Sequence, residues 1–276
     1  MLNLDETNVA QHYNQSGFEY ERVRLQQYSP VEFAITTRYL NRWIRDGATV
    51  VDIGVGVGHY AELLAQRGCL LYLIDISQNL LDTTYTRLKA ANLDRQVLSV
   101  QQASATQVVN VENAIADAVL LLGPLYHLCS LEARQNAVRE AARILKSDGL
   151  LFAAGINRLA YLRELFRNQP EEVVARQEFH RQFLQDGNVT PEHAPPLGYG
   201  HLTTQVEFHQ LFETDFDQIA MIGIESFSAP FPTLVNTFEP KQVEAWIDLV
   251  EATGHTPEGL GMSDHFLYIG KKKNGK

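Results

Sequence analysis

The stretch VVDIGVGVGHY at positions 50–60 constrains the fold of this chain more than any other. β-Branched residues that end in an acid, then glycines at alternate positions, then apolar residues at helical spacing indicate a buried strand, a tight turn and a helix. Glycine permits positive φ angles and lets a ligand lie directly against the backbone. The following helix points its unpaired N–H groups at the same place. The stretch therefore predicts a turn that binds a nucleotide-like ligand.

The spacing of these glycines narrows the choice of ligand. The dinucleotide fingerprint GxGxxG would need a glycine at His59, whereas here Gly54 and Gly56 are followed by Gly58. Asp52, at the end of the strand, would also repel a pyrophosphate. The pattern instead suits a cofactor that carries a cationic amino group.

A second acid ends the next predicted strand. Residues 69–74 are apolar, and Asp75 follows them directly. A carboxylate at the end of the second strand of a βαβ unit can accept hydrogen bonds from both hydroxyls of a ribose. We therefore expect Asp75 to bind a ribose; the alternative is an ordinary solvated aspartate at a strand end.

Strands and helices alternate along the rest of the chain. The predicted strands are nearly continuous in apolar residues, which is typical of a parallel sheet covered on both faces. The later strands are expected at 97–100, 116–122, 150–156, 216–224 and 266–269. We expect a single domain over 1–276, with a helical N-terminal arm (1–47), a core (48–156 and 201–276) and an insertion (157–200).

The glycine stretch resembles motif I of the class I S-adenosylmethionine-dependent methyltransferases. The segment DAVLLLGPLYHL at 117–128 is similar to a motif after strand four in one small-molecule branch, and RILKSDG at 143–149 is similar to the corner before strand five. Such enzymes share a doubly wound, Rossmann-like α/β fold with three α/β/α layers and a seven-stranded sheet whose last strand is antiparallel. The resemblance implies methyl transfer (EC 2.1.1.-) from S-adenosyl-L-methionine, with S-adenosyl-L-homocysteine as product.

The same resemblance assigns cofactor-binding residues. The glycines would line the aminoacid portion of the cofactor, and Gly123 would border its sulfonium. The family usually has an aspartate after strand three, where this chain has Gln102, whose side-chain oxygen can still accept a hydrogen bond from the adenine amino group. Ser104 is the other candidate there. The full expected set is Asp52, Gly54, Gly56, Gly58, Asp75, Ile76, Gln102, Ala103 and Gly123.

Methyl transfer from a sulfonium is an in-line displacement, so the protein mainly aligns the reactants and excludes water. A hydroxyl, thiol or amine acceptor also needs a base to remove its proton. His127 is the candidate, because imidazole titrates near neutral pH, and Tyr126 would shape the acceptor site. A histidine that only bonds to the backbone is the alternative. Tyr13, Tyr20 and Arg22 are further candidates from the arm. No acids stand at obvious metal-binding spacing, so we expect metal independence.

Two segments are expected to close the site. The arm before Val31 is rich in aromatic residues, and the insertion from Asn157 to Gly200 is longer than a connection requires. Ligands in open α/β sheets bind beyond the carboxyl ends of the strands. We expect both segments to close over the cofactor and to form most of the acceptor pocket; for the insertion, a mere surface embellishment is the alternative.

Composition excludes some partners. A formal charge of -10 and a pI of about 5.4 provide no electrostatic footprint for nucleic acid. No apolar stretch approaches the ~20 residues of a membrane span, and the N-terminus has no signal-peptide pattern. We therefore expect a cytoplasmic protein that acts on a small molecule. Two other functions stay open: an NAD-dependent oxidoreductase, which the glycine spacing opposes, and a non-catalytic cofactor-binding or regulatory protein of the same fold.

Overall fold

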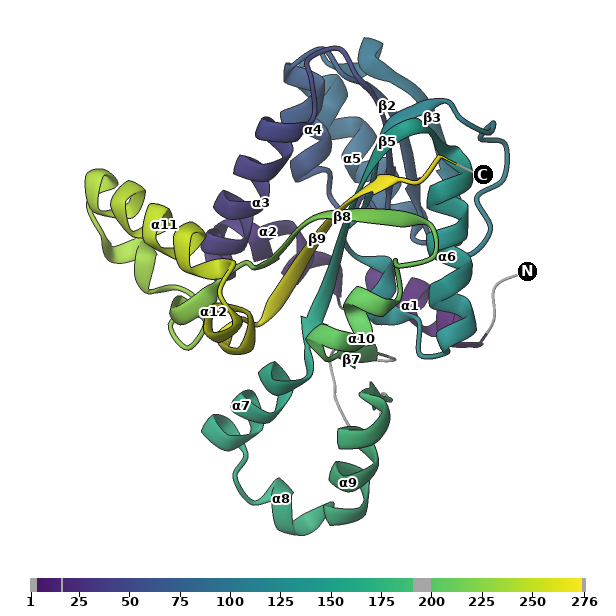
Figure 1. Ribbon diagram of the computed structural model, residues 1–276. Coiled ribbons are helices and arrows are strands. Elements are labelled where there is room, and N and C mark those ends of the chain that lie inside the picture. The colour runs from purple at the N-terminus through teal and green to yellow at the C-terminus, as the bar shows by residue number, and fades with distance from the viewer. Residues whose placement is uncertain (1–3, 16, 191–199, 275–276) are drawn as a thin grey trace.

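The computed structural model describes residues 4–15, 17–190 and 200–274, and its centre is a twisted sheet (Figure 1). Parallel strands follow the order β3-β2-β1-β4-β5, and β9 then runs antiparallel to both β5 and β8. This arrangement confirms the predicted Rossmann-like sheet with an antiparallel last strand. These strands are β1 (Thr49–Ile53), β2 (Leu70–Asp75), β3 (Val97–Gln102), β4 (Ala116–Leu121), β5 (Leu145–Asn157), β8 (Phe216–Gly223) and β9 (His265–Lys272).

Two strands extend the sheet beyond the seven that were predicted. β6 (Asn188–Val189) and β7 (Gly200–Thr203) form an antiparallel pair, and β7 runs parallel to the end of β5, where Asn157 pairs with Thr203. β4 pairs with β5 only as far as Ala153. β7 therefore continues the sheet on the side of β5 where β4 has already ended, so the insertion is joined to the core through the sheet.

Helices cover both faces of the sheet, as the continuous apolar strands predict. One face packs against α3 (Pro30–Trp43), α4 (His59–Gln66), α5 (Gln78–Ala90) and α11 (Pro240–Gly254). The other face packs against α6 (Leu131–Ile144), α10 (Gln205–Gln210) and α12 (Pro257–Met262). Short helical turns η2 (Asp94–Gln96), η3 (Pro124–His127), η4 (Ser226–Ser228) and η5 (Leu234–Thr237) connect these elements.

The arm and the insertion leave the core in different directions. The arm contains α1 (Leu4–Asn14), α2 (Gly17–Val23) and a π-helical turn, η1 (Arg24–Tyr28), and α1 contacts α5 and η3. The insertion contains α7 (Arg158–Asn168), α8 (Glu172–Ala175) and α9 (Gln177–Asp186), which project away from the sheet (Figure 1). Residues 1–3 and 16 of the predicted arm and 191–199 of the predicted insertion lie outside the described residues. Among the residues described, none of the helices has the length and apolar character of a membrane span.

Candidate active site

The glycine turn connects β1 to α4 at the carboxyl ends of the strands. Gly54, Gly56 and Gly58 have φ angles of 81°, 59° and 79°, a region that side chains strain. The N–H of Gly54 donates to the carbonyl of Ile74 on β2 at 2.8 Å. A Cβ on Gly54 would lie 2.7 Å from Cδ of Pro124, so the turn after β4 packs directly on the turn after β1.

The other two glycines have different surroundings. A Cβ on Gly58 would lie 2.6 Å from Cγ2 of Thr84, so a side chain there would break the packing of the turn on α5. A Cβ on Gly56 would lie 3.4 Å from a carboxylate oxygen of Glu21, across the pocket. Packing therefore requires Gly58, whereas a Cβ on Gly56 would reach an ordinary contact distance from the arm, so any larger side chain there would press on Glu21.

Two buried acids end the first two strands. Asp75 accepts hydrogen bonds from the N–H groups of Gly56 and Ser77, both at 2.9 Å, but burial still raises its pKa to about 6. Burial, and then the charge of Asp75, raise the pKa of Asp52 to about 7. The Asp52 carboxylate has no hydrogen-bond donor in the described part of the chain, although its residue is only 4% exposed. A cationic or hydroxyl-bearing ligand at this place would offset both desolvation penalties.

The two aspartates and most of the predicted cofactor residues line two adjoining pockets. Gly54, Gly56 and Gly123 lie in both pockets. Asp75, Ile76 and Ala103 line the first pocket, and Asp52 and Gly58 line the second. Gln102 lines neither of them, and its amide nitrogen donates to the carbonyl of Ile76 at 3.0 Å.

The arm covers the first pocket. Glu6, Val9, Tyr13 and Glu21 line it opposite the core residues. The Tyr13 hydroxyl forms a 2.9 Å hydrogen bond with Nε2 of His127. This contact ties α1 to the loop after β4, so the arm and the loop form one wall of the pocket.

Further polar contacts hold the arm in place. The Ser104 hydroxyl donates to the carboxylate of Glu6, and Ser77 donates to the side-chain oxygen of Asn14 at 2.6 Å. Ser104, the alternative candidate for the adenine amino group, is therefore already bonded to the arm.

The two predicted catalytic residues lie in the loop after β4. His127 is 8% exposed and lines the first pocket, and Tyr126 lines both pockets. Burial, outweighing the nearby charge of Arg24, raises the pKa of Tyr126, so its phenol is neutral at physiological pH. The loop thus presents a neutral hydroxyl and an imidazole next to Gly123.

The other arm candidates lie away from the pockets. Tyr20 is 53% exposed and stacks on Tyr28, and Arg22 is exposed. The arginine that reaches the second pocket is Arg24, which lies two positions further along the chain. The sequence offered a weak signal for it, because Glu21 and Arg24 stand at helical spacing, i and i+3.

Arg24 is part of a buried ion pair. Its guanidinium donates to both carboxylate oxygens of Glu32, at 2.6 and 3.2 Å, and to Glu21 at 3.3 Å. The side chains of Arg24 and Glu32 are 16% and 11% exposed. The base of the arm is therefore fastened to the start of α3 beside the second pocket.

The insertion takes no part in either pocket. None of its described residues, 157–190, lines them. Asp186 and Asn188 line a third pocket, to which Tyr126, Arg134 and His201 also contribute. The lid role of the insertion stays a prediction, whereas the arm lies over the glycine turn.

Comparisons with known proteins agree with this architecture. Residues 51–153, from β1 into β5, match the family model described as a methyltransferase domain. The chain is 29% identical over 143 residues to the ubiquinone biosynthesis O-methyltransferase of Caulobacter vibrioides, covering 49% of this chain and 54% of that protein. It is also 29% identical over 155 residues to the tRNA (carboxymethyluridine(34)-5-O)-methyltransferase ALKBH8 of Mus musculus, covering 54% of this chain and 20% of that protein. The chain thus spans about half the length of the first relative.

Solved structures share the fold over the whole chain. One from Thermotoga maritima, described as an S-adenosylmethionine-dependent methyltransferase and possible histamine N-methyltransferase, has a TM-score of 0.57 at 18% identity. The match covers 96% of this chain and 99% of that one. At this identity the likeness concerns the fold alone. The fold and the domain match together support S-adenosylmethionine-dependent methyltransferase as the class of this chain, with S-adenosylmethionine as its cofactor.

Proposed function

We propose that this protein is an S-adenosylmethionine-dependent methyltransferase that acts on a small molecule. The observation that supports this most directly is the carboxylate of Asp52, which is buried next to the glycine turn without a hydrogen-bond donor in the described residues. A buried carboxylate without a partner is costly, so it either takes up a proton, as its raised pKa of about 7 reflects, or is stabilised by a cationic ligand. The cationic amino group of the cofactor suits this position, whereas a pyrophosphate does not.

The remaining pocket residues complete the proposed binding mode. Asp75 has lone pairs left beyond its two backbone bonds and can accept from the ribose hydroxyls. Arg24 lines the same pocket as Asp52 and supplies positive charge for the cofactor carboxylate. Gly123 borders both pockets, which supports the expected position of the sulfonium beside it.

Bound S-adenosylmethionine supplies an electrophilic methyl group on its sulfonium. The chain has to align the acceptor with that group, exclude water and receive a proton. Tyr13 can accept a proton from the acceptor while its own hydroxyl proton passes to Nε2 of His127, since the two side chains are hydrogen-bonded at 2.9 Å. In this proposal His127 is the base, and Tyr13 of the arm relays the proton to it.

A small-molecule acceptor is favoured over a nucleic acid. The formal charge of -10 opposes binding to a phosphate backbone. The relatives named for ubiquinone biosynthesis match a larger share of their own length than does the tRNA-modifying relative.

Calorimetric titrations with S-adenosylmethionine, S-adenosylhomocysteine and NAD test the proposal. We expect the first two ligands to bind, NAD not to bind, and a screen of small-molecule acceptors to release S-adenosylhomocysteine. Binding of NAD alone would indicate an oxidoreductase. Cofactor binding without turnover of any acceptor would favour a non-catalytic, regulatory protein.

A further inference from the structure

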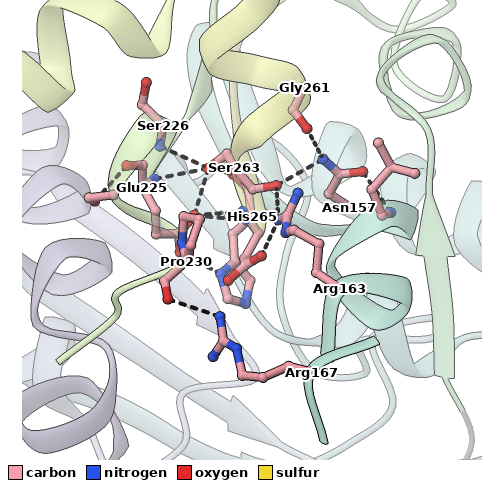
Figure 2. Close-up of polar contacts among 12 residues, drawn as sticks. Asn157, Arg163, Arg167, Glu225, Ser226, Pro230, Gly261, Ser263 and His265 are labelled. Carbon is pink, nitrogen blue, oxygen red and sulfur yellow. Dashed lines mark hydrogen bonds and ion pairs between the residues drawn. The ribbon is translucent and has the colours of Figure 1, made fainter. Parts of the chain in front are cut away.

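A second group of polar residues lies where β8 ends and β9 begins (Figure 2). Glu225, 6% exposed, accepts at Oε2 from the Ser263 hydroxyl at 2.6 Å and from the N–H groups of Asp264 and His265 at 3.1 and 2.9 Å. Its Oε1 accepts from Nδ1 of His265 at 2.6 Å. Both oxygens are engaged, so the carboxylate fixes the orientation of the imidazole.

The opposite ring nitrogen of His265 is left available. Nε2 makes no hydrogen bond or ion pair with any residue that the structure describes, and 21% of the side chain is exposed. Because Nδ1–H of His265 donates to Glu225, Nε2 is the ring atom that can bind a ligand. An imidazole held by a carboxylate on one side and open on the other is prepared to bind a polar group.

His265 lies next to the proposed cofactor site. It pairs with Ile156 on β5, and Ala154, two residues earlier, points to the same face of the sheet. Ala154 lines the pocket that contains Asp52. Glu32 lines that pocket too, and its Oε2 lies 3.9 Å from Nδ1 of His265. The imidazole is therefore at the margin of the pocket, beyond the residues assigned to the cofactor.

Several charged groups face this imidazole. They are Glu225 after β8, Glu32 on α3, Arg24 on η1 and Asp264, which pairs with Arg163 of α7. Burial alone would lower the pKa of His265, but the carboxylates of Glu225 and Glu32 outweigh it and raise that pKa to about 9. The ring is a cation at neutral pH, and Nε2–H is a charge-assisted donor, which pairs best with an anionic oxygen.

We propose that His265 is an acceptor-binding residue, which holds an acidic oxygen of the methyl acceptor, a carboxylate or a phenolate, through Nε2–H. This inference rests on the proposed methyltransferase function and names its substrate class. Glu225 is a positioning residue, because it acts only through His265.

A metal ion is the competing occupant of this cluster. One ligand atom each from Glu32, Glu225 and His265 lie within 4.8 Å of one another. However, Arg24 already donates to both oxygens of Glu32. Arg24 and the His265 imidazolium therefore already pair with the carboxylates of Glu32 and Glu225, which weakens the attraction of the cluster for a divalent cation.

Calorimetric titration of benzoate and benzamide into protein saturated with S-adenosylhomocysteine, at pH 7, tests the assignment. We expect benzoate to bind at least about tenfold more tightly than benzamide, because only the carboxylate forms a charge-assisted bond. His265→Gln should remove this preference without changing the affinity for S-adenosylhomocysteine. In the wild type, benzoate affinity should fall as the pH rises through about 9. His209→Gln, at a histidine on α10 whose side chain is 41% exposed, is the matched control and should behave as the wild type.

The possible failures are distinguishable. A wild type that does not bind S-adenosylhomocysteine contradicts the proposed function, and the assignment fails with it. Intact S-adenosylhomocysteine binding with no benzoate preference, or with the same preference in His265→Gln, overturns the assignment alone. If His265→Gln does not unfold cooperatively, the variant is not folded well enough for the comparison, and NMR spectra of the wild type with ¹⁵N-labelled histidine replace it. Benzoate must then shift the ¹⁵N resonances of the imidazole that is still protonated at pH 8. If Mg²⁺, and not benzoate, shifts these resonances, the cluster is a metal site and the assignment is overturned.

Discussion

The N-terminal arm and the insertion after β5 both lie outside the core, and both were expected to close the site. They differ in their contacts, because the arm lines the cofactor pockets and the described part of the insertion does not. The arm contributes Tyr13 and Glu21 to the first pocket, and its Arg24 is fastened to α3 by a buried ion pair. The helices of the insertion carry solvent-exposed pairs such as Arg181–Glu178 and reach neither cofactor pocket. Length in excess of a connection therefore does not place a segment at the cofactor pockets; of the described residues in these two segments, those of the arm line the pockets and those of the insertion do not.

The largest expected difference is in the unfolding free energy that is lost when Arg24 of the arm and Arg181 of the insertion are each replaced by methionine. Arg24→Met leaves Glu32 and Glu21 buried without their cation, which should cost about 3 to 5 kcal/mol of unfolding free energy. Arg181→Met, in the insertion, removes an exposed i, i+3 pair and should cost about 0.2 to 0.5 kcal/mol. Urea denaturation measures both. Similar values for the two variants would contradict the distinction between the buried ion pair at the base of the arm and the exposed ion pair on α9.

Gly56→Val tests whether the cofactor fills the space between the turn and the arm. The new side chain would point across the pocket, so we expect cofactor affinity to fall by more than about 100-fold, or about 3 kcal/mol. Gly68→Val is the matched control, since Gly68 has a similar positive φ of 73° with nothing within 4 Å of its Cβ position. It should lower stability but keep S-adenosylhomocysteine affinity. Unchanged affinity in Gly56→Val would remove the turn from the cofactor site.

Asp75→Ala is expected to weaken S-adenosylhomocysteine binding by about 1.5 to 3 kcal/mol, as the loss of charged hydrogen bonds usually does. The variant also removes the acceptor for the N–H groups of Gly56 and Ser77, which adds to the loss. Asp82→Ala, at an exposed acid on α5, should bind normally. Calorimetry compares them, and an Asp75→Ala variant with parental affinity would make Asp75 only a strand-end residue.

Cofactor affinity should depend on pH through the protonation of Asp52. Burial raises the pKa of Asp52 to about 7, so its carboxylate, which would bind the amino group, is lost as the pH falls below 7. Affinity should therefore fall by up to about tenfold for each pH unit below 7. Asp52→Asn should lower the affinity at pH 8 and remove this step. A wild-type affinity that is constant from pH 8 to 5.5 would exclude Asp52 from the cofactor site.

Hydrogen exchange compares the arm and the insertion directly. With S-adenosylhomocysteine bound, we expect slower exchange in residues 4–28, because the arm lines the pocket that the ligand enters. A smaller change, or none, is expected in residues 158–186. Equal protection of both segments would support the prediction that the arm and the insertion both close over the cofactor.

The sequence predicted those features whose conformation is determined by residues close to one another along the chain. Apolar runs located β1, β2 and β4, and the alternate glycines located the turn, because strand burial and positive φ are local requirements. Asp75 was found because it directly follows a strand. Its place in the pocket follows from the parallel arrangement of the strands, which the same runs predict.

The rest depends on contacts between distant residues. Beyond its i, i+3 spacing from Glu21, nothing near Arg24 in the sequence indicates that it, rather than Arg22, faces Glu32 and the pocket. Glu225 and His265 are separated by a whole helical connection and meet only because β8 and β9 pair. Gln102 was placed on the cofactor by analogy with an acid at the same strand end; its amide nitrogen donates to the carbonyl of Ile76, and the role of its side-chain oxygen stays a prediction.

The register of β7 against β5 has a consequence for how such proteins diversify. The insertion leaves the sheet at Asn157 and returns at Thr203, and these two residues are partners on neighbouring parallel strands, about 4.8 Å apart. A segment whose two ends are adjacent can be exchanged for one of another length without altering the strands that hold the glycine turn. Residues 158–202 therefore form a natural cassette, and grafting the corresponding segment of a related enzyme between Asn157 and Thr203 should leave the strands that carry the glycine turn intact.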